Sequence, residues 1–258
     1  MEKIKFKVNK DKLEDLITRL SDLTDIDDSI KMKIDSEHIM IYSTLGGNIL
    51  LAFKNYLLPL QEYLTPNKDL DFVLDVIIAN AKKFVKNLRF IDDDKITMEI
   101  SYKDSLDDDN TKDARGIMIK AGKFKIKWIA GEKYEIRDIN KSILDKQLDL
   151  NNKKWSFEIK KSEFDDIKKL SSINSDKIIN INVSDGKVIF SETSAWELEI
   201  SNTDTDINTS LILNKRFLKC INEQEIVNFH IFPNFMLVKN DDYNLMLSME
   251  QNFSDDDL

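Results

Sequence analysis

The chain has 258 residues, and its 38 Lys and Arg against 47 Asp and Glu give a formal net charge of −9 at pH 7. This balance excludes a generally basic nucleic-acid coat protein and leaves room only for a local basic face. One cysteine and two histidines exclude a disulfide framework and a histidine metal cluster, so we expect no metal and no other cofactor. Without an apolar run of roughly 18 residues, we expect no membrane partner and a cytoplasmic location, in the host cell if the protein is viral.

The first half of the chain predicts a strand and an amphipathic helix, then a hairpin, two strands, a second helix and three closing strands. In chain order these elements are 6–16, 30–34 with 39–41, 49–53, 70–74, 80–88, 95–102, 116–120 and 123–129. Five Asp within 104–113 predict a long solvated loop.

The second half repeats this order. Its elements are 157–167, 178–183 with 188–190, 196–200, 211–213, 214–221, 225–231, 235–239 and 244–250. Without a gap, Phe6 aligns with Phe157 and Leu13 with Phe164. An internal repeat of this kind predicts two similar domains of α+β class, each with two helices packed on an antiparallel sheet. We place domain 1 at 1–131, a connector at 132–154 and domain 2, with an acidic C-terminal tail, at 155–258.

Two helices of the repeat carry basic side chains and no acid. The helix at 80–88, counted with Arg89, has four cations, and the helix at 214–221 has three. Both are therefore positively charged in a chain whose net charge is negative. A pair of equivalent acid-free helices favours phosphate binding over an ordinary solvated helix face, which remains the alternative. The candidates are Lys82, Lys83, Lys86, Arg89, Lys215, Arg216 and Lys219, with Lys168 and Lys169 as weaker candidates on a helix of mixed charge.

One pattern is compatible with an enzyme. Asp149 followed by Glu158 and Lys160 resembles the acids and lysine of some metal-dependent nucleases, in which carboxylates hold magnesium. Alternate residues of a half-exposed strand are also often charged, and Lys7 occupies the place of Glu158 in the first repeat. We favour this second interpretation, so no catalytic residue is assigned and a non-enzyme is expected.

The order of the repeat, the chain length and the placement of charge together resemble the DNA sliding clamps, or polymerase processivity factors, and most of all the clamp of T-even-like bacteriophages. The resemblance covers nearly the whole chain and has its anchors at 155–173, 176–200 and 212–258. It implies the DNA-clamp fold, three subunits closed into a ring, and helices that line a hole for double-stranded DNA without sequence specificity. It also implies two partners in DNA replication, a replicative polymerase and an ATP-driven clamp loader.

The resemblance further implies where subunits and clients bind. The strand at 123–129 is expected to pair with the strand at 195–200 of the next subunit, and the large apolar residues there are Phe124, Trp128, Trp196 and Leu198. A client groove is expected near the connector, which offers Ile139, Ile143, Leu144 and Leu148. Packing within one subunit is the alternative for both sets. Besides the nuclease, an acidic structural or DNA-mimicking phage protein remains an alternative function.

Overall fold

The computed structural model describes residues 1–46, 50–139, 144–146, 148–193, 195–200, 208–222 and 224–249. The described residues belong to two compact units, one drawn from 1–47 and 54–138 and the other from 48–53 and 139–258. Ile143 and the acidic tail at 254–258 lie outside the described residues. No helix of the described part is long and apolar enough to cross a bilayer.

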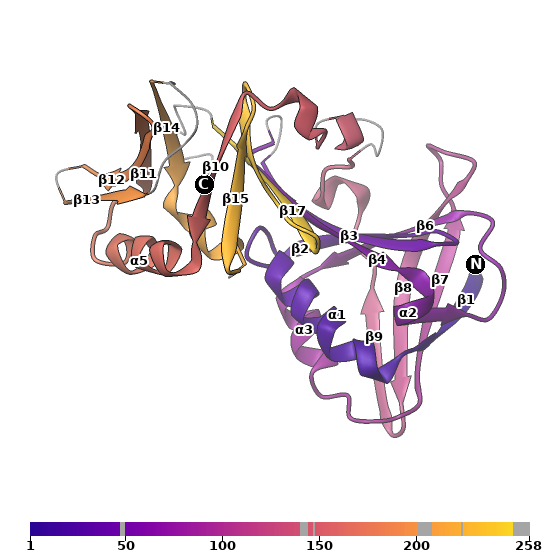
Figure 1. Ribbon diagram of the computed structural model, residues 1–258. Coiled ribbons are helices and arrows are strands. Elements are labelled where there is room, and N and C mark those ends of the chain that lie inside the picture. Colours follow the sequence, from indigo (N-terminus) through magenta and orange to yellow (C-terminus); the bar gives the residue numbers. More distant parts are fainter. Residues whose placement is uncertain are drawn as a thin grey trace. The chain divides into compact units, whose positions relative to one another are not determined.

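The first unit is one sheet with two long helices on one face (Figure 1). Its elements are β1 (Glu2–Val8), α1 (Lys10–Leu23), β2 (Ser29–Ile34), β3 (His38–Leu45), β4 (Ala52–Pro59, which begins in the second unit), α2 (Leu60–Tyr63), β5 (Leu64–Pro66), β6 (Val73–Ala79), α3 (Ala81–Leu88), β7 (Ile96–Asp104), β8 (Thr111–Ala121), β9 (Phe124–Ile129) and the 3-10 helix η1 (Lys133–Glu135). The strand order is β4-β3-β2-β6-β8-β7-β1-β5, and β9 pairs with β8.

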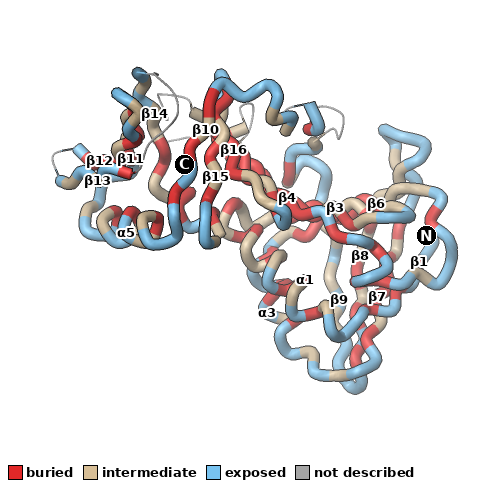
Figure 2. Tube along the Cα trace, in the orientation of Figure 1, coloured by how far each residue is buried: buried red, intermediate tan, exposed pale blue. Residues whose placement is uncertain are grey.

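Apolar and polar residues alternate along β1, and this alternation determines which side of the sheet the helices cover. Ile4, Phe6 and Val8 are buried, whereas the lysines between them are exposed. Most of the length of β3 and β4 is also buried (Figure 2). Apolar side chains of α1 and α3 meet this buried side around a small apolar void of about 30 Å³. The opposite side of β1 is therefore the polar face of the sheet.

The two long helices begin at defined caps. The side chain of Asn9 accepts a hydrogen bond from the backbone N–H of Asp11 at the start of α1. At the start of α3, Asn80 has a φ of 52°, and Asp28 supplies the cap from another part of the chain. Its carboxylate accepts from the N–H of Lys82 at 2.7 Å, and its carbonyl accepts from the N–H of Ala81 at 2.8 Å.

The second unit contains two antiparallel sheets, ordered β10-β15-β16-β17 and β13-β12-β11-β14. Its elements are the 3-10 helix η2 (Leu150–Asn152), β10 (Trp155–Lys160), α5 (Lys161–Ser171), β11 (Ile178–Ser184), β12 (Lys187–Glu192), β13 (Trp196–Ile200), β14 (Thr209–Asn214), the 3-10 helix η3 (Lys215–Cys220), β15 (Ile226–Ile231), β16 (Phe235–Lys239) and β17 (Tyr243–Ser248). Phe157 stacks on Phe229 with 4.8 Å between ring centroids, and Phe190 meets Phe157 edge-on. These aromatic rings form the centre of the unit's core.

The predicted α+β class and the paired strand–helix starts of the two halves are confirmed, since β1 and α1 correspond to β10 and α5. Four local details differ from the expectations. The helix predicted at 214–221 is a short 3-10 helix. The strands predicted at 49–53 and 70–74 lie later in the chain, at Ala52–Pro59 and Val73–Ala79. In addition, β7 and β8 extend into the acidic stretch at 104–113. The last difference arises because Thr111–Asp113 pair with β6 rather than remaining in solvent.

Candidate nucleic-acid interface and subunit edges

Helix α3 separates apolar and basic side chains onto opposite faces. Its buried side chains are Ala81, Phe84, Val85 and Leu88. Its exposed side chains include those of Lys82, Lys83 and Lys86, which make no ion pair within the part of the chain that the structure describes. Because an unpaired exposed ammonium group keeps its full charge for a partner, this face is suited to bind phosphate.

The neighbouring helix α1 has acids, but cations of the same unit neutralise two of them. Asp15 accepts from the guanidinium of Arg19 at 2.9 Å. Although burial raises the pKa of Asp15, the hydrogen bonds from Arg19 and from the Tyr63 hydroxyl hold that pKa below its usual value. Asp22 binds the ammonium of the fully buried Lys54 at 2.6 Å. These two carboxylates therefore add little negative charge beside α3.

The basic residues of η3 include one cation that is bound to a buried acid. The ammonium of Lys215 lies 2.9 Å from the carboxylate of Glu192, whose side chain is 0% exposed. It also donates to the backbone carbonyl of Asn174 at 2.7 Å. Lys215 thus neutralises a buried acid of β12. The sequence could not reveal this partner, because Glu192 lies 23 positions earlier.

Lys219 is exposed, whereas Arg216 is half-buried like Lys215. The guanidinium of Arg216 lies over the ring of Phe217, 5.6 Å from its centroid. On α5, the ammonium of Lys168 lies 4.7 Å from the ring centroid of Phe164, and Lys169 pairs with Asp166 at 3.4 Å. The cations of the second unit are therefore more engaged with their own chain than those of α3. The last candidate, Arg89 at the end of α3, donates to the Ser21 hydroxyl at 3.2 Å.

Strand β9 is an edge strand with unusually exposed side chains. It pairs with β8 from Phe124 opposite Ala121 to Ile129 opposite Gly116, and no second pairing of β9 occurs among the described residues. Phe124 is 55% exposed and Ile129 is 85% exposed. Exposed apolar side chains on an open strand edge are typical of a surface that pairs with another strand.

Strand β13 ends the second sheet of its unit. It pairs with β12, with Trp196 opposite Glu192 and Leu198 opposite Phe190. Both side chains are partly exposed, and within the described part of the chain the indole N–H of Trp196 has no hydrogen-bond acceptor. Trp128 of β9 packs edge-on against Phe84, 5.3 Å between centroids, so this residue contributes to the packing of its own unit.

The expected client residues occupy different environments. Leu144 is buried, and its carbonyl accepts from the N–H of Leu148 at 2.8 Å. Ile139 and Leu148 are partly exposed. Ile143 lies outside the described residues, so the proposed groove is described only in part.

The residues of the nuclease pattern are exposed and have structural contacts. The carboxylate of Asp149 accepts from the N–H of Asn151 at the start of η2. Glu158 and Lys160 are outward-facing residues of β10. The described residues contain no group of three or more His, Cys, Asp or Glu side chains placed to hold a metal ion.

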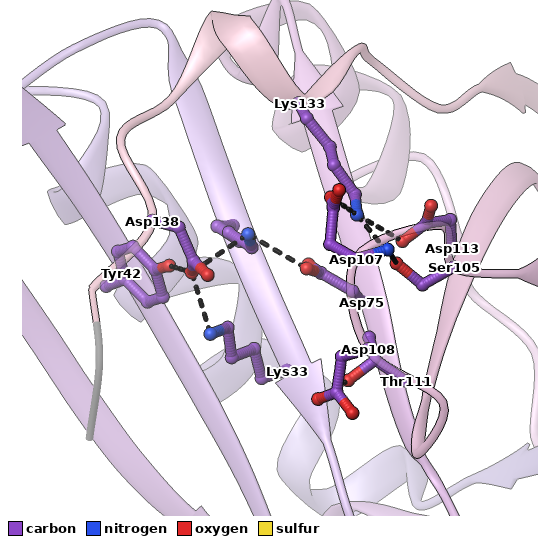
Figure 3. A network of polar contacts seen from close by, with 11 residues as sticks. Lys33, Tyr42, Asp75, Ser105, Asp107, Asp108, Thr111, Asp113, Lys133 and Asp138 are labelled. Carbon is purple, nitrogen blue, oxygen red and sulfur yellow. Dashed lines mark hydrogen bonds and ion pairs between the residues drawn. The ribbon is translucent and has the colours of Figure 1, made fainter. Parts of the chain in front are cut away.

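A polar network, which the sequence analysis did not identify, joins the strands of the first unit to residues after β9 (Figure 3). The Lys31 side chain, 2% exposed, binds Asp75 at 2.8 Å and Asp138 at 3.0 Å. Asp138 also accepts from Lys33 at 2.7 Å and from the Tyr42 hydroxyl at 3.0 Å. Burial would raise the pKa of Asp138, but the two ammonium groups outweigh it and hold the pKa at about 2. The one sequence signal was an acid, Asp75, within the apolar run of β6.

No protein-family model matches the sequence, and no curated protein matches it. Solved structures do match. The β chain of DNA polymerase III from Streptococcus pneumoniae is 12% identical with a TM-score of 0.65, and the match covers 98% of this chain and 67% of that one. The Helicobacter pylori β clamp bound to a DNA ligase peptide is 13% identical with a TM-score of 0.67, covering 96% and 66%.

A third match is the DnaN sliding clamp of Pseudomonas aeruginosa bound to griselimycin, 10% identical with a TM-score of 0.61, covering 98% and 67% of the two chains. The chain therefore spans about two thirds of the length of these proteins. At such low identity the likeness concerns the backbone arrangement. With its two similar α+β units, this chain has the fold of the DNA sliding clamps.

Proposed function

We propose that the protein is a ring-shaped sliding clamp that tethers a replicative DNA polymerase to duplex DNA, without catalytic activity of its own. The observation that carries this proposal is the match of almost the whole chain to several bacterial sliding clamps. The unpaired lysines of α3 add a surface that fits a phosphate backbone. A ring holds DNA topologically, so weak phosphate contacts orient the duplex without stopping its movement.

The DNA contacts of this proposal come first from Lys82, Lys83 and Lys86. Arg89, Arg216 and Lys219 are secondary contacts, and Lys168 and Lys169 remain weaker candidates. The charge of Lys215 is compensated within its own unit, so we propose a structural role for it. No base-specific contact is required, because phosphate binding carries no sequence information.

For the assembly we propose a homotrimer of the T-even bacteriophage type. A closed ring requires a head-to-tail contact between two unlike edges of each subunit. The open edges of β9 and β13 fit this requirement, because each strand has a sheet neighbour on one side. Clamp domains at 1–131 and 155–258 with a connector at 132–154 complete the proposal. The division of the chain into units after Asp138 lies inside that connector.

The proposed partners are double-stranded DNA, a replicative polymerase and an ATP-driven clamp loader, within the cytoplasm of the cell that replicates the DNA. A peptide of DNA ligase is bound in one of the similar clamps, which supports peptide-mediated client binding here. We keep Ile139, Ile143, Leu144 and Leu148 as the candidate client residues. The buried position of Leu144 favours Ile139 and Leu148 as the side chains that meet a peptide.

Two measurements test the proposal. Native mass spectrometry is expected to give three times the chain mass of 30.1 kDa. Loader-dependent retention on nicked circular DNA, lost when the circle is linearised, is expected from a ring that slides off ends. A monomer with no retention would refute the clamp function, and magnesium-dependent cleavage that disappears in Glu158→Ala would establish the nuclease instead.

A further inference from the structure

The first unit contains a cavity lined by both charged and apolar residues at the point where β6 and β8 separate. The two strands pair over three positions, from Val73 opposite Thr111 to Asp75 opposite Asp113, and then separate. Residues 130–131 bridge the separation, because the N–H of Ala130 donates to the Arg115 carbonyl at 3.3 Å and the N–H of Gly131 donates to the Ile77 carbonyl at 2.8 Å. A cavity of about 310 Å³ remains beside this bridge.

The close approach at Gly131 fixes one wall of the cavity. A Cβ at this position would lie 2.8 Å from Cγ2 of Ile77 and 2.8 Å from a carboxylate oxygen of Glu135. Only glycine fits without a shift of these neighbours, so residues 130–131 are held against β6. The cavity is therefore a built part of the unit.

Asp75 lines this cavity and has an unused acceptor. Its residue is 7% exposed. One carboxylate oxygen, Oδ2, binds the Lys31 ammonium at 2.8 Å, whereas Oδ1 has no hydrogen-bond partner among the residues that the structure describes. A buried carboxylate oxygen without a donor is costly, so the cavity is suited to a ligand that brings an N–H group.

The carboxylates of the wall already have cations beside them. Four carboxylates and three cations line the cavity, and Lys31, which is not part of the wall, binds the carboxylate of Asp75. The Lys133 ammonium binds Asp107 at 2.6 Å and Asp113 at 3.2 Å (Figure 3), and Arg115 lies 4.0 Å from Glu132. The feature that points to a ligand is therefore Oδ1 of Asp75, and since the described residues offer no group that could hold a metal ion, the expected ligand is an organic group with N–H donors.

Two exposed apolar side chains lie at the cavity. Leu106 is 91% exposed and Tyr134 is 87% exposed, and both line it. An aromatic face beside carboxylates suits a guanidinium, which stacks on rings and is less strongly hydrated than an ammonium. The apolar Leu106 suits the aliphatic stem of the same side chain.

We propose that this cavity binds the guanidinium group of an arginine side chain presented by a peptide segment, with Asp75 Oδ1 as acceptor and Tyr134 as stacking partner. The site requires neither a closed ring nor DNA, so it is independent of the proposed clamp function. A cavity of this volume is at the lower end of ligand sites, which fits one side chain rather than a large molecule.

Calorimetric titration of the full chain tests this assignment. The probe is N-acetylarginine methylamide, and its neutral counterpart of the same shape is N-acetylcitrulline methylamide. We expect saturable binding of the arginine probe alone. Asp75→Asn is expected to weaken that binding roughly tenfold, because a hydrogen bond to a charged group is lost. Asp71→Asn, an exposed acid before β6 with the same charge change, is the matched control and is expected to bind like the parent.

Tyr134→Ala provides a second variant that leaves the packing intact, since this side chain is exposed. It is expected to weaken binding roughly threefold through the lost stacking, and it decides the question if Asp75→Asn does not fold. Equal binding of the citrulline probe, or unchanged affinity in the folded variants, would overturn the proposal. The absence of saturable binding by the parent would overturn it as well, whatever the outcome of the DNA retention assay.

Discussion

Reversing the charge of the exposed α3 lysines is the most direct test of the DNA path. The triple variant Lys82→Glu, Lys83→Glu and Lys86→Glu changes the net charge by −6, from −9 to −15 per chain. In the proposed ring of three subunits the hole would lose nine positive charges and gain nine negative ones, a change of −18. Attraction of the phosphate backbone would thus become repulsion.

The variant is expected to fold, so a loss of DNA binding could not be attributed to unfolding. The buried residues of α3 are unchanged, and Lys and Glu have similar helix propensities. Glu at 82 and 83 meets the helix N-terminus favourably, whereas Glu at 86 is unfavourable in the last turn. These contributions oppose each other, and we expect a change in unfolding free energy within about 0.5 kcal/mol.

The expected readout is the salt dependence of retention on circular DNA and of processive synthesis. Each phosphate contact contributes a slope of about 0.9 in the dependence of log affinity on log salt, so three lost contacts remove about 2.7 per subunit and nine remove about 8 around the proposed ring. Replacing the same lysines with Gln is expected to give an intermediate effect. The control reverses Lys7, Lys95 and Lys120, which are exposed and lie outside both α3 and β9. If the α3 variant is retained like its parent, the α3 face does not meet DNA and our assignment is wrong.

Three further changes test other parts of the structure. Lys215→Ala is expected to cost about 3–5 kcal/mol in urea denaturation, because it leaves the buried Glu192 without its cation. Lys187→Ala, which removes an exposed ion pair with Glu199, is the control and is expected to cost less than about 1 kcal/mol; equal effects would contradict the structural role. Asp138→Asn is expected to cost roughly 1 kcal/mol at pH 7, less than the full shift from 3.8 to about 2 implies because this side chain is largely exposed. Because its folded pKa is depressed, this contribution is present above about pH 4 and disappears as the pH falls through about 2, so a difference from the parent that persists below pH 2 would point to another cause. Lys127→Pro is expected to abolish trimers in native mass spectrometry while the chain stays folded, with Lys127→Ala as the control; a trimer that survives would exclude the β9 edge.

The choice of Lys127 follows from the hairpin between β8 and β9. Ala121 and Phe124 enclose a two-residue turn, so they form a hydrogen-bonded pair. Alternation along an antiparallel ladder then directs the N–H of Lys125, Lys127 and Ile129 to the open edge. A proline at Lys127 removes a donor from that edge and leaves the pairing with β8 in place.

The sequence by itself determined the class of the fold and its internal repeat. Apolar side chains at every second position of β1, and at helical spacing in α3, are set by local periodicity, which needs no knowledge of distant residues. The basic face of α3 could be predicted for the same reason, since neighbours along a helix share a face. The edges of β9 and β13 were expected only through the resemblance to clamps.

Tertiary structure decided which charges are available to a partner. Lys215 and Lys82 looked equivalent in the repeat, but folding places Glu192 against the Lys215 ammonium. Asp28 meets only the backbone N–H of Lys82, and the Lys82 ammonium forms no ion pair among the described residues. The cavity at Asp75 likewise exists only because β6 and β8 pair over three residues and then part. Ion pairs and cavities bring together residues that are far apart in the sequence, so no local pattern determines them. Helices and strands, in contrast, are determined by the spacing of apolar and polar side chains along a short stretch of the chain.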